Sequence, residues 1–268
     1  MKYIRFFSLL LSLALLAGCS IVPFQTPEEQ RAAQETAEAL KLEAQAQADP
    51  FEMLESNFLL SRTLTNSQGV TLATYQVSFP KFSENGEKAQ SFSRINSYYE
   101  NEITGLIQDA YSFFNVVMAA YGEGWDTVTQ ADKAFRVDIG YELLEAPAGY
   151  LCVRCDFLVE ENGQQESYSR AQVFLLDNGW QLTLETLLGD KYEDSAPKLM
   201  ASILAWCSNN GISVTNAEDR ALEEFSTNYA LTNDCFFFYT EPFQLSNKNA
   251  NRYSIPVSLS GYRSMLND

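Results

Sequence analysis

The stretch SRINSYYENEITGLIQDAYSFFNVVMAAY, Ser93–Tyr121, decides the fold of this chain because its apolar residues recur at helical spacing. A helix with this periodicity carries one apolar face, and that face needs a sheet to cover. The apolar positions are Ile95, Tyr99, Leu106, Ala110, Phe113, Phe114 and Val117. The pattern therefore predicts a long amphipathic helix packed on a sheet.

Strand patterns flank this helix on both sides. Residues 70–79 alternate between apolar and polar, and Pro80 is expected to end that strand before a turn at Asn85-Gly86. Residues 135–143, 151–159 and 168–176 read as three further strands, and Trp180, Leu182 and Leu184 as a fourth. Asn-Gly pairs at 162–163 and 178–179 favour short turns, so antiparallel neighbours are expected.

The remaining sequence predicts a second, smaller part. A helix begins at Ser195-Ala196-Pro197 and stops at Gly211, and a shorter helical stretch covers 217–225. Residues 235–239 and 253–259 read as two strands divided by a polar loop. The predicted fold is α+β: an antiparallel sheet covered by a long helix in residues 67–184, then a smaller helix-plus-strands half in 185–268.

The N-terminal segment predicts the location of the protein. Lys2 and Arg5 precede roughly ten apolar residues, which is the layout of a secretory signal and too short to span a bilayer stably. Leu16-Ala17-Gly18-Cys19 resembles the lipobox of bacterial lipoproteins, whose cysteine is acylated before cleavage. We therefore expect a signal peptide at 1–18 and a lipid on Cys19 that holds the protein on the extracytoplasmic face of the membrane. The alternative is an ordinary signal peptide or membrane anchor that contains Cys19.

A helical tether is expected next, within residues 19–66. Thr26, Pro27 and Glu29 form an N-cap, first-turn proline and capping-box arrangement, and an alanine- and glutamate-rich stretch follows to about Ala48. Alanine dominates its apolar positions, which favours a spacer, although a dimerising helix remains an alternative. The sequence leaves the oligomeric state open.

Composition excludes several classes of function. The formal net charge of −17 excludes nucleic-acid binding and favours basic proteins or divalent cations as partners, although acidity also serves solubility alone. The chain has no histidine, which removes Ser-His-Asp and Cys-His catalysis and the ordinary zinc hydrolase sites. It also lacks P-loop, Rossmann and EF-hand motifs, so no cofactor or metal is expected.

Four cysteines follow Cys19, namely Cys152, Cys155, Cys207 and Cys235. Outside the cytoplasm they could pair, and four cysteines allow three connectivities that spacing cannot separate. Strand periodicity places Cys155 on the apolar side, and Cys152 with Arg154 and Asp156 on the other. No helix follows this CxxC, so a structural role is favoured over a redox role.

The order of segments resembles the extracytoplasmic domain of RsiV-type anti-sigma factors. The resemblance is carried by YQVSFPKFSENGEKAQSFSRINSYYENEI (75–103), LTLETLLGDKYEDSAPKLMASI (182–203) and the closing strands with FSTNYALTNDCFFFYTEPFQLS (225–246). Similar domains occur in bacterial lipoproteins and beside polysaccharide deacetylase domains. The resemblance implies an α+β ectodomain that binds lysozyme. This chain departs from the pattern in its cleavable signal and in the run 247–251, where the family has aromatic and glycine residues.

Two loops are the candidate ligand-binding sites, because loops carry recognition on a rigid scaffold. Glu123 and Trp125 lie in YGEGWDTV, where Trp125 either anchors a ligand or caps the long helix against the sheet. Glu241 and Phe243 lie in the loop 241–252, whose alternative is a solvated connection. We expect a lipid-anchored, non-catalytic binding protein whose ligand is lysozyme or a cell-wall component. The alternatives are a structural envelope component, or a glycan-cleaving enzyme that uses a carboxylate pair drawn from Glu123, Asp126, Glu142 and Glu241.

Overall fold

The computed structural model describes residues 50–133, 135–262 and 266. The expected signal peptide at 1–18, the lipid on Cys19 and the helix ending near Ala48 lie outside these residues. These described residues form one compact unit. None of the helices in the described ranges is long and apolar enough to cross a membrane.

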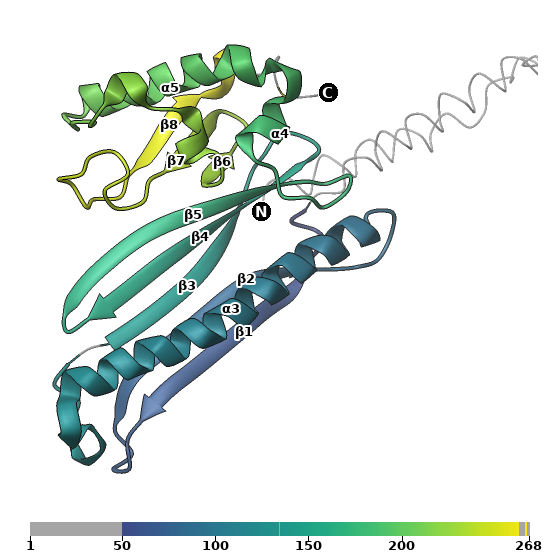
Figure 1. The fold of residues 1–268 in the computed structure, drawn as a ribbon. Helices are drawn as coiled ribbons and strands as arrows, with labels where there is room; N and C mark the ends of the chain where they lie inside the picture. Colours follow the sequence, from purple (N-terminus) through teal and green to yellow (C-terminus); the bar gives the residue numbers. More distant parts are fainter. Residues whose placement is uncertain (1–49, 134, 263–265, 267–268) are drawn as a thin grey trace, which may run out of the picture. The chain divides into compact units, whose positions relative to one another are not determined.

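A five-stranded sheet and one long helix form the first part of this unit (Figure 1). The strands lie in the order β1-β2-β3-β4-β5. Antiparallel pairs join β1 to β2 and make a meander of β3, β4 and β5, whereas β2 and β3 run parallel. The bounds are β1 Leu54–Thr65, β2 Thr71–Phe82, α3 Ala89–Tyr121, β3 Phe135–Leu144, β4 Tyr150–Glu161 and β5 Gln164–Leu175.

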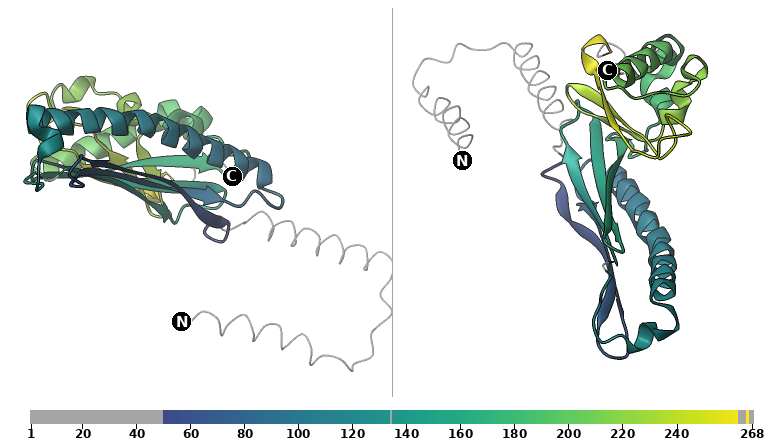
Figure 2. Two further views of the ribbon diagram at one scale, coloured as in Figure 1. Left: turned by 90° about the horizontal axis from the view of Figure 1, so that it is seen from below. Right: turned by 90° about the vertical axis from the view of Figure 1, so that its left-hand side faces the viewer.

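The helix α3 is the crossover between the two parallel strands, and it covers one face of the sheet in both views of Figure 2. Every apolar position that defines its periodicity, except the half-buried Leu106, is buried. Parallel neighbours need a crossover of this length, so the β2–β3 pair departs from the expectation of antiparallel neighbours throughout. The predicted helix-on-sheet arrangement is otherwise confirmed.

A three-stranded antiparallel sheet and two helices form the second part. The helix α5 ends where Gly211, with φ of +70°, allows the Ile212 amide to reach the Cys207 carbonyl at 2.9 Å. The expected helix at 217–225 is instead two short 3₁₀ turns. The bounds are α4 Leu184–Leu188, η2 Gly189–Lys191, α5 Tyr192–Asn209, η3 Ala217–Asp219, η4 Leu222–Phe225, β6 Tyr229–Leu231, β7 Cys235–Tyr239, β8 Ser254–Ser258 and η5 Leu259–Gly261.

Three local expectations were wrong. Residues 54–65 form β1, so the tether expected to reach residue 66 is too long. Pro80 lies inside β2, opposite Asn57 of β1. The pairing of β2 with β3 ends at Val77, so at Pro80 no second strand requires the backbone N–H that proline lacks. Leu184 begins α4 instead of ending a fourth strand, because the Thr183 side chain caps that helix by accepting from the Thr186 amide.

Two hydrophobic cores meet at β4. Val153 and Cys155 face the core beneath α3, which also contains Phe92, whereas Cys152 faces the core built around α5, β7 and β8. Cys152 lies on the opposite face from Cys155 and on the same face as Arg154, as predicted, but it is fully buried there, so this face is not polar at Cys152. The N-terminal half of β4 is therefore buried on both faces of the sheet.

All four described cysteines are free thiols. Burial raises the pKa of both Cys152 and Cys155 to about 12. A thiol that stays protonated is a poor nucleophile, so both side chains act as packing groups in this structure.

Candidate functional site

Glu123 and Trp125 lie in the 3₁₀ turn η1, Gly122–Thr127, which follows α3 directly. The Trp125 side chain is half-buried against the core beneath α3. The backbone carbonyl of Trp125 accepts a hydrogen bond from the Asn66 side chain at 3.2 Å. Asp126 accepts from the Ser67 amide at 2.8 Å. These contacts fasten the turn to the β1–β2 hairpin, which is the arrangement expected if Trp125 caps the long helix. Glu123 is exposed.

Glu241 and Phe243 lie in the loop that joins β7 to β8. Glu241 is held between two arginines: Arg170 Nη2 approaches its Oε1 at 2.8 Å, and Arg252 Nε approaches its Oε2 at 3.4 Å. Arg252 also pairs with Glu166 of β5. The carboxylate is thus a structural partner that joins the loop to the edge of the large sheet.

An aromatic stack completes this attachment. Tyr168 and Phe157 lie face to face with ring centroids 4.6 Å apart, and the Arg252 guanidinium lies 3.7 Å from the Tyr168 centroid. Burial raises the pKa of Tyr168, and the adjacent arginines oppose that effect. The loop is therefore held in place by ion pairs and a cation–π contact, and it is not the solvated connection considered from the sequence.

Phe243 is the apolar tip of this loop. Its side chain is 57% exposed, and its backbone has φ of +62°, a left-handed conformation that bulky residues rarely adopt. The Phe243 amide donates to the Asn249 carbonyl at 3.1 Å, which closes the loop on itself. A large apolar side chain held outward on a fixed loop is a suitable anchor for a partner.

The candidate residues fall into two separate places. Trp125 packs on the core beneath α3, whereas the β7–β8 loop rests through Leu245 on the core around α5. Among the carboxylate candidates, Glu142 pairs with Arg154 on the sheet and Glu241 with its two arginines, whereas Glu123 and Asp126 both lie in η1. Glu142 and Glu241 are therefore held by different arginines.

A hollow that the sequence did not predict lies beside the β7–β8 loop. It has a volume of about 650 Å³ and opens between the C-terminal end of α5 and residues 246–253. None of the described residues that line it carries a carboxylate. Its walls are Trp206, Asn210, Gly211, Ile212, Ser213, Ser246, Lys248, Asn249 and Tyr253.

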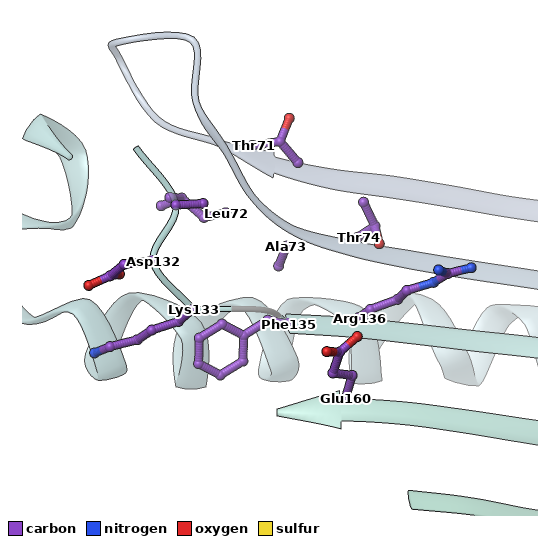
Figure 3. Close-up of a pocket in the computed structure, with 10 residues that line it drawn as sticks. Thr71, Leu72, Ala73, Thr74, Asp132, Lys133, Phe135, Arg136 and Glu160 are labelled. Atoms are coloured by element: carbon purple, nitrogen blue, oxygen red, sulfur yellow. The ribbon is translucent and has the colours of Figure 1, made fainter. Parts of the chain in front are cut away.

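A second hollow, of about 450 Å³, lies where β2 and β3 begin (Figure 3). Glu160 and Arg136 are opposite each other in the strand register. Figure 3 shows Asp132 at the other end of the hollow, with the Phe135 ring between it and Glu160. The Lys133 ammonium donates to the Ala120 carbonyl of α3. The two carboxylates of this hollow are thus also apart.

Residues suited to a metal are not gathered in the described part of the chain. No group of three or more His, Cys, Asp or Glu side chains there is placed to hold an ion. The arrangement offers aromatic, amide and hydroxyl contacts, and these suit recognition of a ligand.

Comparisons with known proteins give a fold. No family model matches the sequence, and no curated protein matches it. A DUF3298 family protein from Bacteroides fragilis has a similar structure, with a TM-score of 0.52 and 13% identity over 80% of this chain and 94% of that one. A DUF3298 family protein from Pseudomonas aeruginosa aligns with a TM-score of 0.40 and 12% identity over 76% of this chain and 90% of that one. At such low identity the first match shows the fold alone: this chain has the α+β fold of a DUF3298 protein.

Proposed function

We propose that this protein is a lipid-anchored, non-catalytic binding protein on the extracytoplasmic face of a bacterial membrane. The observation that carries the proposal is the β7–β8 loop, which is fastened by Glu241 and Arg252, presents Phe243 outward and borders a hollow whose described lining holds no carboxylate. A fixed loop with an apolar tip beside a mixed polar and aromatic hollow suits binding. The lipobox-like Leu16-Ala17-Gly18-Cys19 supports the location.

The ligand we propose is lysozyme or a cell-wall component. The net charge of −17 favours a basic partner, and the resemblance to RsiV-type anti-sigma factors points to lysozyme. The finer relationship to the RsiV type is part of this proposal. The structure supports the wall component through the aromatic and amide side chains of the hollow, Trp206, Asn210, Asn249 and Tyr253.

Membrane attachment and ligand binding are tested separately. Cells expressing the full-length protein are fed an alkyne-bearing palmitate, and we expect the label on the wild type and none on Cys19→Ala. Label on the variant, or an uncut N-terminus by mass spectrometry, would refute the anchor.

Binding is tested with the full-length protein purified in detergent. We expect it to retain lysozyme or purified cell wall in a sedimentation assay, and we expect no release of soluble sugar from the wall. Sugar release that is lost in Glu142→Gln or Glu241→Gln would instead establish the carboxylate-dependent enzyme. Retention of neither material would refute the binding function.

A further inference from the structure

Two aromatic rings form the walls of the hollow beside the β7–β8 loop. Trp206 comes from the last turn of α5 and Tyr253 from the residue before β8, and their centroids lie 6.4 Å apart at an interplanar angle of 68°. Both rings are half-buried. The Tyr253 hydroxyl accepts from the Asn249 side chain at 2.7 Å, which fixes the orientation of its ring.

Aromatic rings that line a hollow suit a saccharide. The C–H bonds of a pyranose gather on one side of its ring and are apolar, whereas its hydroxyls point outward. An aromatic face therefore packs against the apolar side and leaves the hydroxyls to nearby polar groups.

Those polar groups are present. The Ser246 hydroxyl is largely buried and accepts from the Thr215 hydroxyl and the Lys248 amide, both at 3.4 Å, so its own hydrogen is available to a ligand. Asn210 donates to the Trp206 carbonyl at 2.8 Å, which leaves its side-chain oxygen as an acceptor. Ser213 adds a hydroxyl at the rim.

The charge of the lining selects among saccharides. Lys248 is its one charged side chain, and within the described ranges its ammonium has no ion-pair partner. A ligand that brings a carboxylate would pair with this ammonium.

We propose that this hollow binds a pyranose saccharide that carries a carboxylate, with Trp206 and Tyr253 packing on the sugar ring, Ser246 and Asn210 bonding its hydroxyls and Lys248 pairing with its acid. The inference deepens the proposed function, on which it rests, by naming the chemical class of the wall ligand. The volume of the hollow, about 650 Å³, suits a ligand of one or two sugar rings.

Two sugars that differ by one acidic group test the assignment. N-acetylmuramic acid carries a lactyl carboxylate that N-acetylglucosamine lacks, and each is titrated into the full-length protein while the indole N–H signals are followed by NMR. We expect the Trp206 signal to shift, and the acidic sugar to bind up to about fivefold more tightly, which is the upper end of what one exposed ion pair supplies. Equal affinities would overturn the role of Lys248, and no shift with either sugar would overturn the site.

Matched variants locate the site. Trp206→Ala should weaken binding at least about tenfold, as loss of a central aromatic anchor does, whereas Trp180→Ala, which removes an exposed ring stacked on Arg94, should leave it unchanged. Lys248→Met should remove the preference for the acidic sugar, whereas Lys198→Met, at an exposed position of α5, should keep it. Lys248 is exposed, so its variant remains informative if Trp206→Ala fails to fold.

The outcome separates this site from the proposed function. If the protein retains cell wall or lysozyme but Trp206→Ala and Lys248→Met bind like the wild type, the saccharide site is refuted and the binding function stands. If it retains neither, the proposed function fails first.

Discussion

Asn96 takes the place of a strand partner at the end of β2. Its side-chain oxygen accepts from the Phe82 amide at 2.9 Å, and its side-chain nitrogen donates to the Phe82 carbonyl at 2.8 Å and to Glu84 at 2.8 Å. One amide group thus satisfies both backbone groups of a residue that no third strand reaches. This contact gives a physical reason for a polar side chain, Asn96, on the buried face of α3.

Replacing Asn96 should therefore destabilise the protein strongly. Asn96→Ala leaves the Phe82 N–H and C=O buried without partners, and we expect a loss of about 2–4 kcal/mol in the free energy of unfolding measured with urea. Asn101→Ala, at an exposed position of the same helix, is the control and should cost less than about 1 kcal/mol. Equal losses would show that the Phe82 contacts contribute nothing.

The thiols of Cys152 and Cys155 in β4 make the free energy of unfolding depend on pH in the alkaline range. Their folded-state pKa of about 12 lies above the ordinary value of 9.0, because burial favours the neutral thiol. The unfolded chain therefore releases these protons first, so their contribution is complete below pH 9 and is lost as pH rises toward 12.

We expect the free energy of unfolding to fall above pH 9 by at most about 1.4 kcal/mol per pH unit for each thiol. Buried tyrosines such as Tyr99 add to the fall, so the comparison is made between variants. The slope, measured by urea unfolding from neutral to alkaline pH, should be smaller in the double variant Cys152→Ala/Cys155→Ala than in the wild type. An unchanged slope in the double variant would refute the assignment.

At the scale of elements, the turn after β5 packs directly on α3. Gly179 has φ of +72°, and a Cβ atom there would lie 2.3 Å from the Ser91 carbonyl oxygen near the start of α3. Gly163, in the β4–β5 turn, has φ of +80° but no atom within 4 Å of its would-be Cβ. The two glycines separate the cost of the backbone conformation from the cost of a clash.

We expect Gly163→Ala to cost about 1 kcal/mol and Gly179→Ala more than about 2 kcal/mol. The thermal midpoint of each variant, followed by circular dichroism, measures the difference. Similar midpoints for both would mean that the turn and α3 move apart without cost.

The elements differ in how far their sequences determine them. The long helix and the β4–β5 hairpin were predictable, because many apolar residues at one spacing and an Asn-Gly pair agree with the tertiary structure. The edge strand β1 was missed because it buries only Leu60, so its alternation is weak. Leu184 was misassigned because one hydroxyl cap at Thr183 outweighs a short strand pattern.

The candidate site was harder to predict for a related reason. Glu241 and Phe243 were placed correctly in a loop, but the partners of Glu241 come from β5 and from the far end of the loop. Trp206 and Tyr253 meet because α5 packs on β8, far from it in the sequence. Such contacts between distant segments leave no periodic signal in the sequence.

At the scale of the whole molecule, β4 joins the two cores. It contributes Cys152 to the core around α5 and Val153 and Cys155 to the core beneath α3. If β4 detaches from one core, its side chains also leave the other core, and the apolar residues of both cores become exposed. The two halves anticipated from the sequence, 67–184 and 185–268, should therefore unfold together in one cooperative transition.

Two buried isoleucines test this coupling. Ile95 of α3 and Ile203 of α5 are both fully buried, one in each core. We expect Ile95→Ala and Ile203→Ala each to lower the free energy of unfolding by about 2–5 kcal/mol. Each variant should also lower the urea midpoints of α3 and α5 together, as measured by hydrogen exchange of peptides from the two helices. The control Val116→Ala, at an exposed position of α3, should leave both midpoints in place. If Ile203→Ala lowered the midpoint of α5 alone, the cores would be independent, because a shared β4 makes the loss of either one a loss for both.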